Sequence, residues 1–244
     1  LHMRRNMPKG MLCFQPHVFR AVFSRNPRFV RYQLPTNIIS YMKAQLPVFM
    51  IKRFFGTEVL GQYSITWKVI NIPINLLGSA IGRVFFSRSS ELKREGKPLG
   101  DFAFRNMGIA MRLAVIPVFL IMAVGDVALN IVLGPGWEMA GNFIRILAPY
   151  AFFWFLTMAL QGLTITLEKQ KYSMVSALVQ IGTVTASMLT GAFLFESVYI
   201  GLMLHTISFI VVNIIYFCTL FRTMGVRWSK YLRNVLFYLG LMLG

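Results

Sequence analysis

The sequence predicts an all-α membrane protein with six transmembrane helices and the start of a further helix. Of its 244 residues, 56% are hydrophobic and only 14% are charged, whereas soluble domains carry about 25% charged residues. Several apolar runs reach the length of about 20 residues that a helix needs to cross about 30 Å of hydrocarbon. The runs lack a strict alternation of apolar and polar residues, which favours helices over the strands of a membrane barrel.

The six predicted spans are separated by short segments that contain turn-forming or charged residues. The spans cover residues 35–55, 62–86, 107–131, 143–166, 173–195 and 200–221. The breaks contain Gly56 and Gly61; Gly96, Pro98 and Gly100; Gly134, Pro135 and Gly136; residues 168–171; and Glu196 and Ser197. The last apolar stretch, Val235 to Gly244, is too short to cross a bilayer.

The distribution of basic residues predicts the orientation of these helices. Lys and Arg gather after the second, fourth and sixth spans, and each of the other three loops carries one acid. By the positive-inside rule the basic loops face the cytoplasm. The sequence thus predicts a basic cytoplasmic segment (1–34), a six-helix membrane domain (35–222) and a basic cytoplasmic loop with the start of a further helix (223–244). The basic positions are Arg88, Lys93, Arg94, Lys97 and Arg105; Lys169 and Lys171; and Arg222, Arg227, Lys230 and Arg233.

The chain has 25 Lys and Arg against 8 Asp and Glu, a formal net charge of +17. Nucleic-acid-binding proteins share such an excess, but no nucleic-acid-binding motif is found, so no nucleic-acid partner is expected. In a membrane protein the remaining places for positive charge are cytoplasmic loops and the pathway of an anion.

Polar residues recur inside five of the spans at helical spacing, so that one face of each helix is polar. Such faces are expected around a hydrated interior, although a stripe of Ser and Thr is equally typical of close helix packing. The stripes are Thr36, Ser40 and Lys43; Lys68, Asn71 and Asn75; Thr157, Gln161 and Thr164; Ser173, Ser176, Gln180, Thr183, Ser187 and Thr190; and His205 and Ser208.

Cationic side chains within the spans point to an anionic cargo, because a Lys or Arg near the centre of a span costs about 2.5–3.5 kcal/mol on insertion. Phosphate or diphosphate is the common handle for Arg and Lys. The predicted substrate-binding cations are Lys43, Lys68 and Arg112, followed by Arg145 and Arg83. Asn71, Asn75, Gln161 and Gln180 are predicted to bind sugar hydroxyls. The alternative for Arg83 and Arg145, near span ends, is snorkelling to the headgroups.

Catalytic and metal-binding patterns are absent from the sequence. It contains no GxSxG, no P-loop, no DxD pair and no cluster of His, Cys and acids at metal-ligand spacing. The acids are scattered, and only Asp126 lies well inside a span. No enzymatic activity, metal or cofactor is therefore expected.

Six short stretches resemble the Wzx-type lipid-linked oligosaccharide flippases of the multidrug/oligosaccharidyl-lipid/polysaccharide exporter superfamily. The resemblance runs from about Arg28 to Phe221. The stretches are Tyr32–Asn37, Gln45–Phe49, Arg53–Tyr63, Lys68–Pro73, Leu77–Phe86 and Leu147–Tyr150.

This resemblance implies a MATE-like exporter fold of two six-helix lobes, of which the chain is the C-terminal one. Residues 1–34 would then connect it to an N-terminal lobe that the sequence lacks. The implied function is the flipping of an undecaprenyl-diphosphate-linked oligosaccharide across the bacterial inner membrane, for O-antigen, other lipopolysaccharide, capsule or exopolysaccharide biosynthesis. The implied partners are this lipid-linked substrate, membrane lipid and the other lobe, with a polysaccharide polymerase or chain-length regulator as a further candidate.

Three other interpretations stay open. The first is a cation-coupled multidrug exporter of the same superfamily, for which Asp126 would be the embedded carboxylate. The second is a membrane glycan polymerase or ligase, although the predicted outer loops are short. The third is an inactive half-transporter, in line with a sequence that begins at Leu1.

Overall fold

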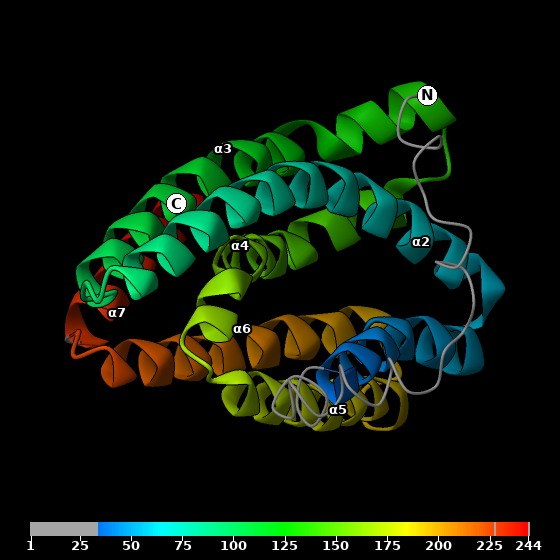
Figure 1. The fold of residues 1–244 in the computed structure, drawn as a ribbon. Helices are drawn as coiled ribbons and strands as arrows, with labels where there is room; N and C mark the ends of the chain where they lie inside the picture. The colour runs from blue at the N-terminus through cyan, green and yellow to red at the C-terminus, as the bar shows by residue number, and fades with distance from the viewer. Residues whose placement is uncertain (1–33, 227, 244) are drawn as a thin grey trace, which may run out of the picture.

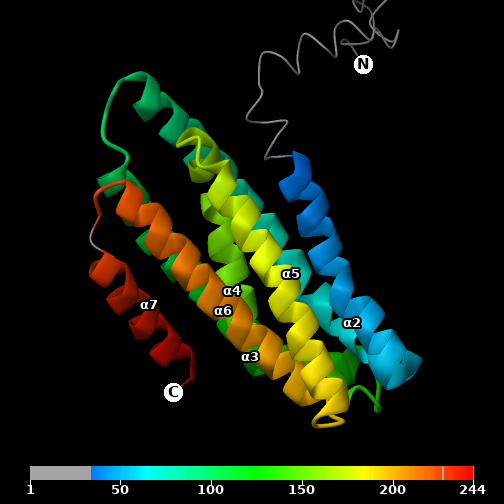
Figure 2. The ribbon, with the colours of Figure 1, turned by 90° about the horizontal axis from the view of Figure 1, so that it is seen from below.

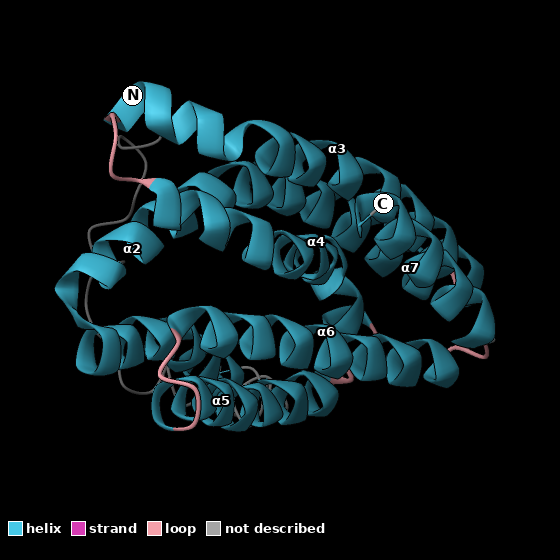
Figure 3. Ribbon diagram, turned by 180° about the vertical axis from the view of Figure 1, so that it is seen from behind, coloured by secondary structure: helices cyan, strands magenta, loops and turns pink. Residues whose placement is uncertain are grey.

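The computed structural model describes residues 34–226 and 228–243, and this part consists of helices and the short loops between them, with no strand. The predicted N-terminal segment, apart from Leu34, lies outside the described residues. Figures 1 and 3 show the helices from two opposite sides, joined by short loops. The helices are α2 (Leu34–Arg94), α3 (Gly100–Leu133), α4 (Glu138–Thr166), α5 (Gln170–Phe193), α6 (Val198–Thr223) and α7 (Trp228–Leu243).

Five of the described helices, α2 to α6, are long and apolar enough to cross a membrane. Helix α2 contains both of the first two predicted spans, because the break between them is confined to Gly56. The prediction of a break across residues 56–61 is therefore wrong: residues 57–61 continue the helix. The first arm of α2 (residues 34–55) is about 33 Å long and the second arm (residues 57–94) about 57 Å, and each exceeds the thickness of the hydrocarbon core.

Helix α2 folds back on itself, as Figure 2 shows, and the non-helical residue inside it is Gly56. Its backbone has φ 91° and ψ 176°, a region that is essentially restricted to glycine. A Cβ atom at this position would meet no atom within 4 Å. The requirement for glycine therefore comes from the backbone conformation and not from crowding.

We expect Gly56→Ala to lower the free energy of unfolding by about 1–3 kcal/mol, because alanine must adopt a strained conformation. Gly61→Ala is the matched control, since Gly61 is helical and has no atom near its Cβ position. That change should be neutral or slightly stabilising. Thermal unfolding of the purified protein in detergent measures the stability of both variants. Equal unfolding midpoints would contradict the conclusion that the backbone at residue 56 requires glycine.

Helix α4 occupies the centre of the bundle and packs against α2, α3 and α6 (Figure 1). Its apolar residues are buried on several sides, including Phe143, Phe152 and Phe155. Gly78 and Gly82 form a GxxxG motif in α2 that lies against α4: a Cβ on Gly78 would be 3.1 Å from Cβ of Met158, and one on Gly82 would be 2.7 Å from the carbonyl oxygen of Met158. These glycines let two helices approach closely, which is the usual role of this motif in membranes.

A glutamine of α2 caps the start of α4. No side chain at Trp137, the residue before α4, accepts from the free amides of its first turn. Instead the amide of Ala140 donates to Oε1 of Gln62 at 3.1 Å, and Nε2 of Gln62 donates to the carbonyl of Gly136 at 2.6 Å. Thr66, one turn further along α2, donates to the carbonyl of Ala140 at 3.0 Å. The second arm of α2 thereby fixes the α3–α4 turn.

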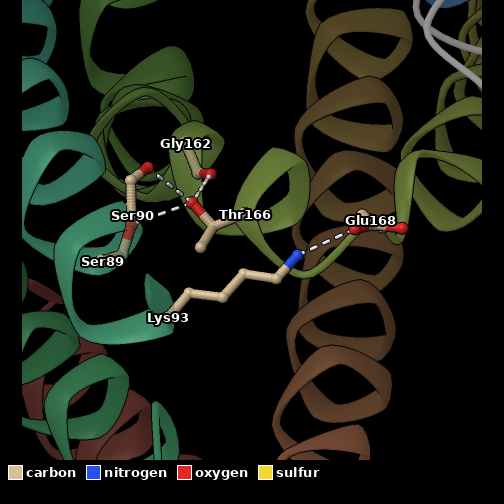
Figure 4. A network of polar contacts seen from close by, with 6 residues as sticks. All are labelled: Ser89, Ser90, Lys93, Gly162, Thr166 and Glu168. Carbon is tan, nitrogen blue, oxygen red and sulfur yellow. Dashed lines mark hydrogen bonds and ion pairs between the residues drawn. The ribbon is translucent and has the colours of Figure 1, made fainter. Parts of the chain in front are cut away.

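The basic loops gather at one end of the bundle. In Figure 2 the α2–α3, α4–α5 and α6–α7 loops lie together at one end, and the bend within α2 with the α3–α4 and α5–α6 loops lies at the other. We call the first the basic end. Figure 4 shows two of its segments tied together: Nζ of Lys93 contacts Oε1 of Glu168 at 2.9 Å, and the hydroxyls of Ser89 and Thr166 are 3.0 Å apart.

Helix α7 is amphipathic and packs against α3 and α6. Tyr231 and Val235 are fully buried, and the ring of Tyr231 lies against those of Phe217 and Phe221. The helix begins at Trp228, seven residues before the apolar stretch that the sequence suggested. Because one face is polar, hydropathy alone underestimates its length.

Candidate functional site: a polar cavity between four helices

A cavity of about 370 Å³ lies between the first arm of α2 and helices α4, α5 and α6. We call it the polar cavity. Three of the polar stripes in the sequence meet in its wall, one from each of α2, α4 and α5. The stripe residues that line it are Thr36, Ser40 and Lys43; Thr157, Gln161 and Thr164; and Ser173, Ser176 and Gln180.

Lys43 is the only charged side chain among the described residues that line the polar cavity. Its Nζ donates to Oε1 of Gln180 at 2.6 Å and lies 5.6 Å from the centroid of the Phe209 ring. Gln180 is buried and its Nε2 lies 3.2 Å from Oγ of Ser176. The partly buried ammonium of Lys43 is thus held by a neutral acceptor and an aromatic face. The backbone carbonyl of Lys43 lacks its usual helical donor, because Pro47, one turn later, has no N–H.

Helix α6 contributes polar side chains that hydropathy did not single out. The hydroxyl of Thr157 is 3.0 Å from Oδ1 of Asn213, which is 1% exposed. The hydroxyls of Thr164 and Tyr216 are 2.6 Å apart. A signal for these residues was present, because Thr206, Phe209, Asn213 and Tyr216 follow the 3-4-3 spacing of a helical face.

Aromatic rings form another part of the wall. Trp67 and Trp154 are stacked, with centroids 5.2 Å apart and planes 13° apart. Tyr150 stacks on Phe209 with centroids 3.9 Å apart, and Phe209 is the ring that Nζ of Lys43 faces. All four residues line the cavity. The buried His205 packs against Tyr150, with ring centroids 5.3 Å apart, as expected for a packing role.

The other predicted site residues lie outside the polar cavity. The structure brings together Lys43, Gln161 and Gln180, but Lys68 is exposed on the second arm of α2 and does not line the cavity. Asn71 and Asn75, on the same arm, are hydrogen-bonded to each other. Arg83, Arg112 and Arg145 are exposed. A role of these residues in substrate binding stays a prediction, and the structure does not place Lys43 and Lys68 in one vestibule.

Comparison with known proteins identifies relatives over about half of the chain. The teichuronic acid biosynthesis protein TuaB of Bacillus subtilis (strain 168) is 26% identical over 121 residues, which are 49% of this chain and 25% of TuaB. The amylovoran biosynthesis protein AmsL of Erwinia amylovora is 23% identical over 128 residues, 52% of this chain and 33% of AmsL. The chain thus matches only a quarter to a third of the length of these relatives. No solved structure matches it significantly.

The sequence profile of one protein family matches residues 11–141, more than half of the chain. That range includes both arms of α2, with Lys43 and Trp67, and ends in the first turn of α4. The remaining wall of the polar cavity, from α4, α5 and α6, follows it in the sequence. The chain is a multi-pass membrane protein that belongs to the family of polysaccharide biosynthesis proteins.

Proposed function

We propose that the chain is one lobe of a transporter that flips a lipid-linked oligosaccharide across the membrane. The cargo would be an undecaprenyl-diphosphate-linked repeat unit for a surface polysaccharide such as O-antigen or capsule, and the membrane would be the bacterial inner membrane. The observation that carries the proposal is the polar cavity with Lys43 as its single described charge. Family membership supports a role in polysaccharide biosynthesis.

The chemistry of the cavity suits the two polar parts of such a cargo. An ammonium in surroundings of low polarity attracts a phosphate or diphosphate strongly. The hydroxyl and amide groups of the three stripes can exchange hydrogen bonds with sugar hydroxyls, and the partly exposed ring of Trp154 offers an apolar platform for a sugar ring. A lipid tail needs no polar pathway, because it can stay in the bilayer.

The same charge disfavours a drug exporter with a cationic cargo. A cation entering the polar cavity would be repelled by Lys43, and among the described lining residues there is no carboxylate to offset this repulsion. Transport of a phosphorylated cargo fits the cavity better.

The cavity belongs to one lobe, and we propose that a second six-helix lobe completes the pathway. The exposed side of the second arm of α2 carries Lys68 and Arg83 beside exposed Ile72 and Leu76. A face that carries both charged and apolar side chains suits a position opposite a second lobe, with a hydrated pathway between the two. Binding of a polysaccharide polymerase or chain-length regulator would be a further property of the assembled transporter.

Inactivation of the gene in its native strain tests the proposal. We expect loss of surface polysaccharide together with accumulation of complete lipid-linked repeat units. Because flipping is the blocked step, the sugars of these units should stay on the cytoplasmic face of the membrane. A membrane-impermeant oxidant should therefore react with them only in inside-out vesicles. An active copy of the gene should restore export.

The other interpretations predict different results. Loss of the repeat unit itself would indicate a biosynthetic enzyme, and accumulation on the outer face would indicate a polymerase or ligase. An unchanged polysaccharide with increased drug sensitivity would indicate a drug exporter. Each of these outcomes would overturn the proposal.

A further inference from the structure

A second and larger hollow lies between α5 and α6 near the basic end of the bundle. It has a volume of about 660 Å³ and is lined by residues of the α4–α5 loop, α5 and α6. We call it the lateral groove. Part of its lining is exposed: Val175 and Val179 are 46% exposed and Ile215 is 60% exposed. The lateral groove therefore opens on the outside of the bundle.

The two parts of the lateral groove differ in chemistry. Val175, Val179, Val212 and Ile215 form an apolar wall. Lys169 and Lys171 line the other end of the groove, where the α4–α5 loop leads into α5. A basic group at one end and hydrocarbon along the length is the complement of an anionic amphiphile.

The charge at the basic part is a net positive one. The carboxylate of Glu168, which also lines the groove, is bound by Nζ of Lys93 at 2.9 Å (Figure 4). Nζ of Lys169 lies 6.0 Å from the centroid of the Tyr172 ring, and Lys171 is exposed. Because Lys93 compensates Glu168, the two other lysines are left to attract an anion.

We propose that the lateral groove binds one anionic phospholipid of the surrounding bilayer. One acyl chain lies along the valine and isoleucine wall, and the phosphate lies beside Lys169 and Lys171. Lysines near the membrane surface attract anionic headgroups by about a factor of five each. Two lysines therefore give a preference of about 25-fold over a zwitterionic lipid with the same chains.

The position of the lateral groove connects this lipid to the polar cavity. Ser176 and Tyr216 line both hollows. The hydroxyl of Tyr216 is also 2.6 Å from that of Thr164 in the cavity wall. A lipid in the groove therefore lies directly behind the cavity, whether or not the cavity transports an oligosaccharide, so its binding can be tested apart from the proposed function.

Lipid retention by the purified full-length protein tests this inference. Native mass spectrometry in an uncharged detergent compares phosphatidylglycerol with phosphatidylcholine of identical chains. We expect phosphatidylglycerol to bind about 25-fold more tightly, and the Lys169→Gln/Lys171→Gln variant to lose at least tenfold of this preference. Arg94→Gln/Arg105→Gln removes two charges from the same end of the bundle, outside the lateral groove, and should keep it.

A second variant tests the apolar part of the groove. Val179→Trp fills it without changing the charge and should reduce the affinity for both lipids. An equal loss in the arginine control, or equal binding of the two lipids, would overturn the proposal, since the groove would then show no specific attraction. Displacement of the lipid by glycerol phosphate would show a site for soluble phosphate, and preferential binding of a polyprenyl phosphate would show a site for cargo; either result would also overturn it.

Discussion

Lys43→Glu is expected to abolish polysaccharide export while the protein still inserts in the membrane. The change places a carboxylate where the polar cavity presents its single described positive charge, so a phosphorylated cargo would meet repulsion. Lys43→Met is expected to weaken cargo binding by about 10- to 150-fold, since a hydrogen bond to a charged group is worth about 1.5–3 kcal/mol. Lys43→Arg should retain most of the transport.

The measurement is surface polysaccharide in a deletion strain that carries each variant at an equal protein level. Lys52→Met is the matched control, because Lys52 is on the same arm of α2, nine residues further on, and is exposed. Its export should match that of the unaltered protein. Normal export by Lys43→Glu would show that Lys43 does not contact the cargo.

Because Lys43 also contacts Gln180, a folding defect must be distinguished from a binding defect. Thermal unfolding of Lys43→Met should shift by only a few degrees, because the lost bond joins a charged group to one neutral acceptor. Loss of export with a nearly unchanged unfolding midpoint would assign the effect to the cargo.

Gly191→Leu is expected to cause the largest loss of stability of any single change considered for this protein. A Cβ at Gly191 would lie 2.5 Å from Cα of Gly201 and 2.9 Å from the carbonyl oxygen of Ser197. These are backbone atoms of α6 and of the turn before it, so the two helices must separate. Overpacking of this kind costs about 3 kcal/mol.

The same helix offers a control for the change in side chain. Gly182 is exposed and a Cβ there would meet nothing within 4 Å. Gly182→Leu should therefore be neutral or slightly stabilising, because leucine favours the helix more than glycine does. The unfolding midpoints of the two variants in one detergent provide the measurement. A midpoint for Gly191→Leu as high as that for Gly182→Leu would contradict the close α5–α6 contact.

The positions of most helices could be predicted because apolar length reports directly on a membrane crossing. The length of the break at Gly56 was harder to predict, because a glycine followed by polar residues is typical both of a loop and of a helix reversal at a single residue. Only the observed φ of 91° distinguishes the two. The extent of α7 was missed for another reason: polar residues are interspersed among the apolar ones in its first two turns, although Tyr231 there is fully buried.

The candidate site was partly predictable from the spacing of polar residues. The stripes through Lys43, Gln161 and Gln180 face one cavity because each helix presents its polar side to the same interior. The stripe through Lys68 also has helical spacing, but Lys68 lies on the exposed side of α2. Periodicity shows that a helix has a polar face, whereas the direction of that face depends on packing. The aromatic part of the wall was missed because Trp and Tyr are also typical of the membrane interface.

If the proposed cargo binds Lys43, the contact of this lysine with Gln180 has a consequence for the rate of cargo binding. A lysine clamped by a carboxylate would have to break an ion pair in surroundings of low polarity before it could receive a phosphate, and that rupture would slow capture. An amide releases an ammonium far more readily. For the proposed phosphorylated cargo, the neutral partner would keep the resting lysine in place and leave only a small barrier to its exchange between Gln180 and a phosphate.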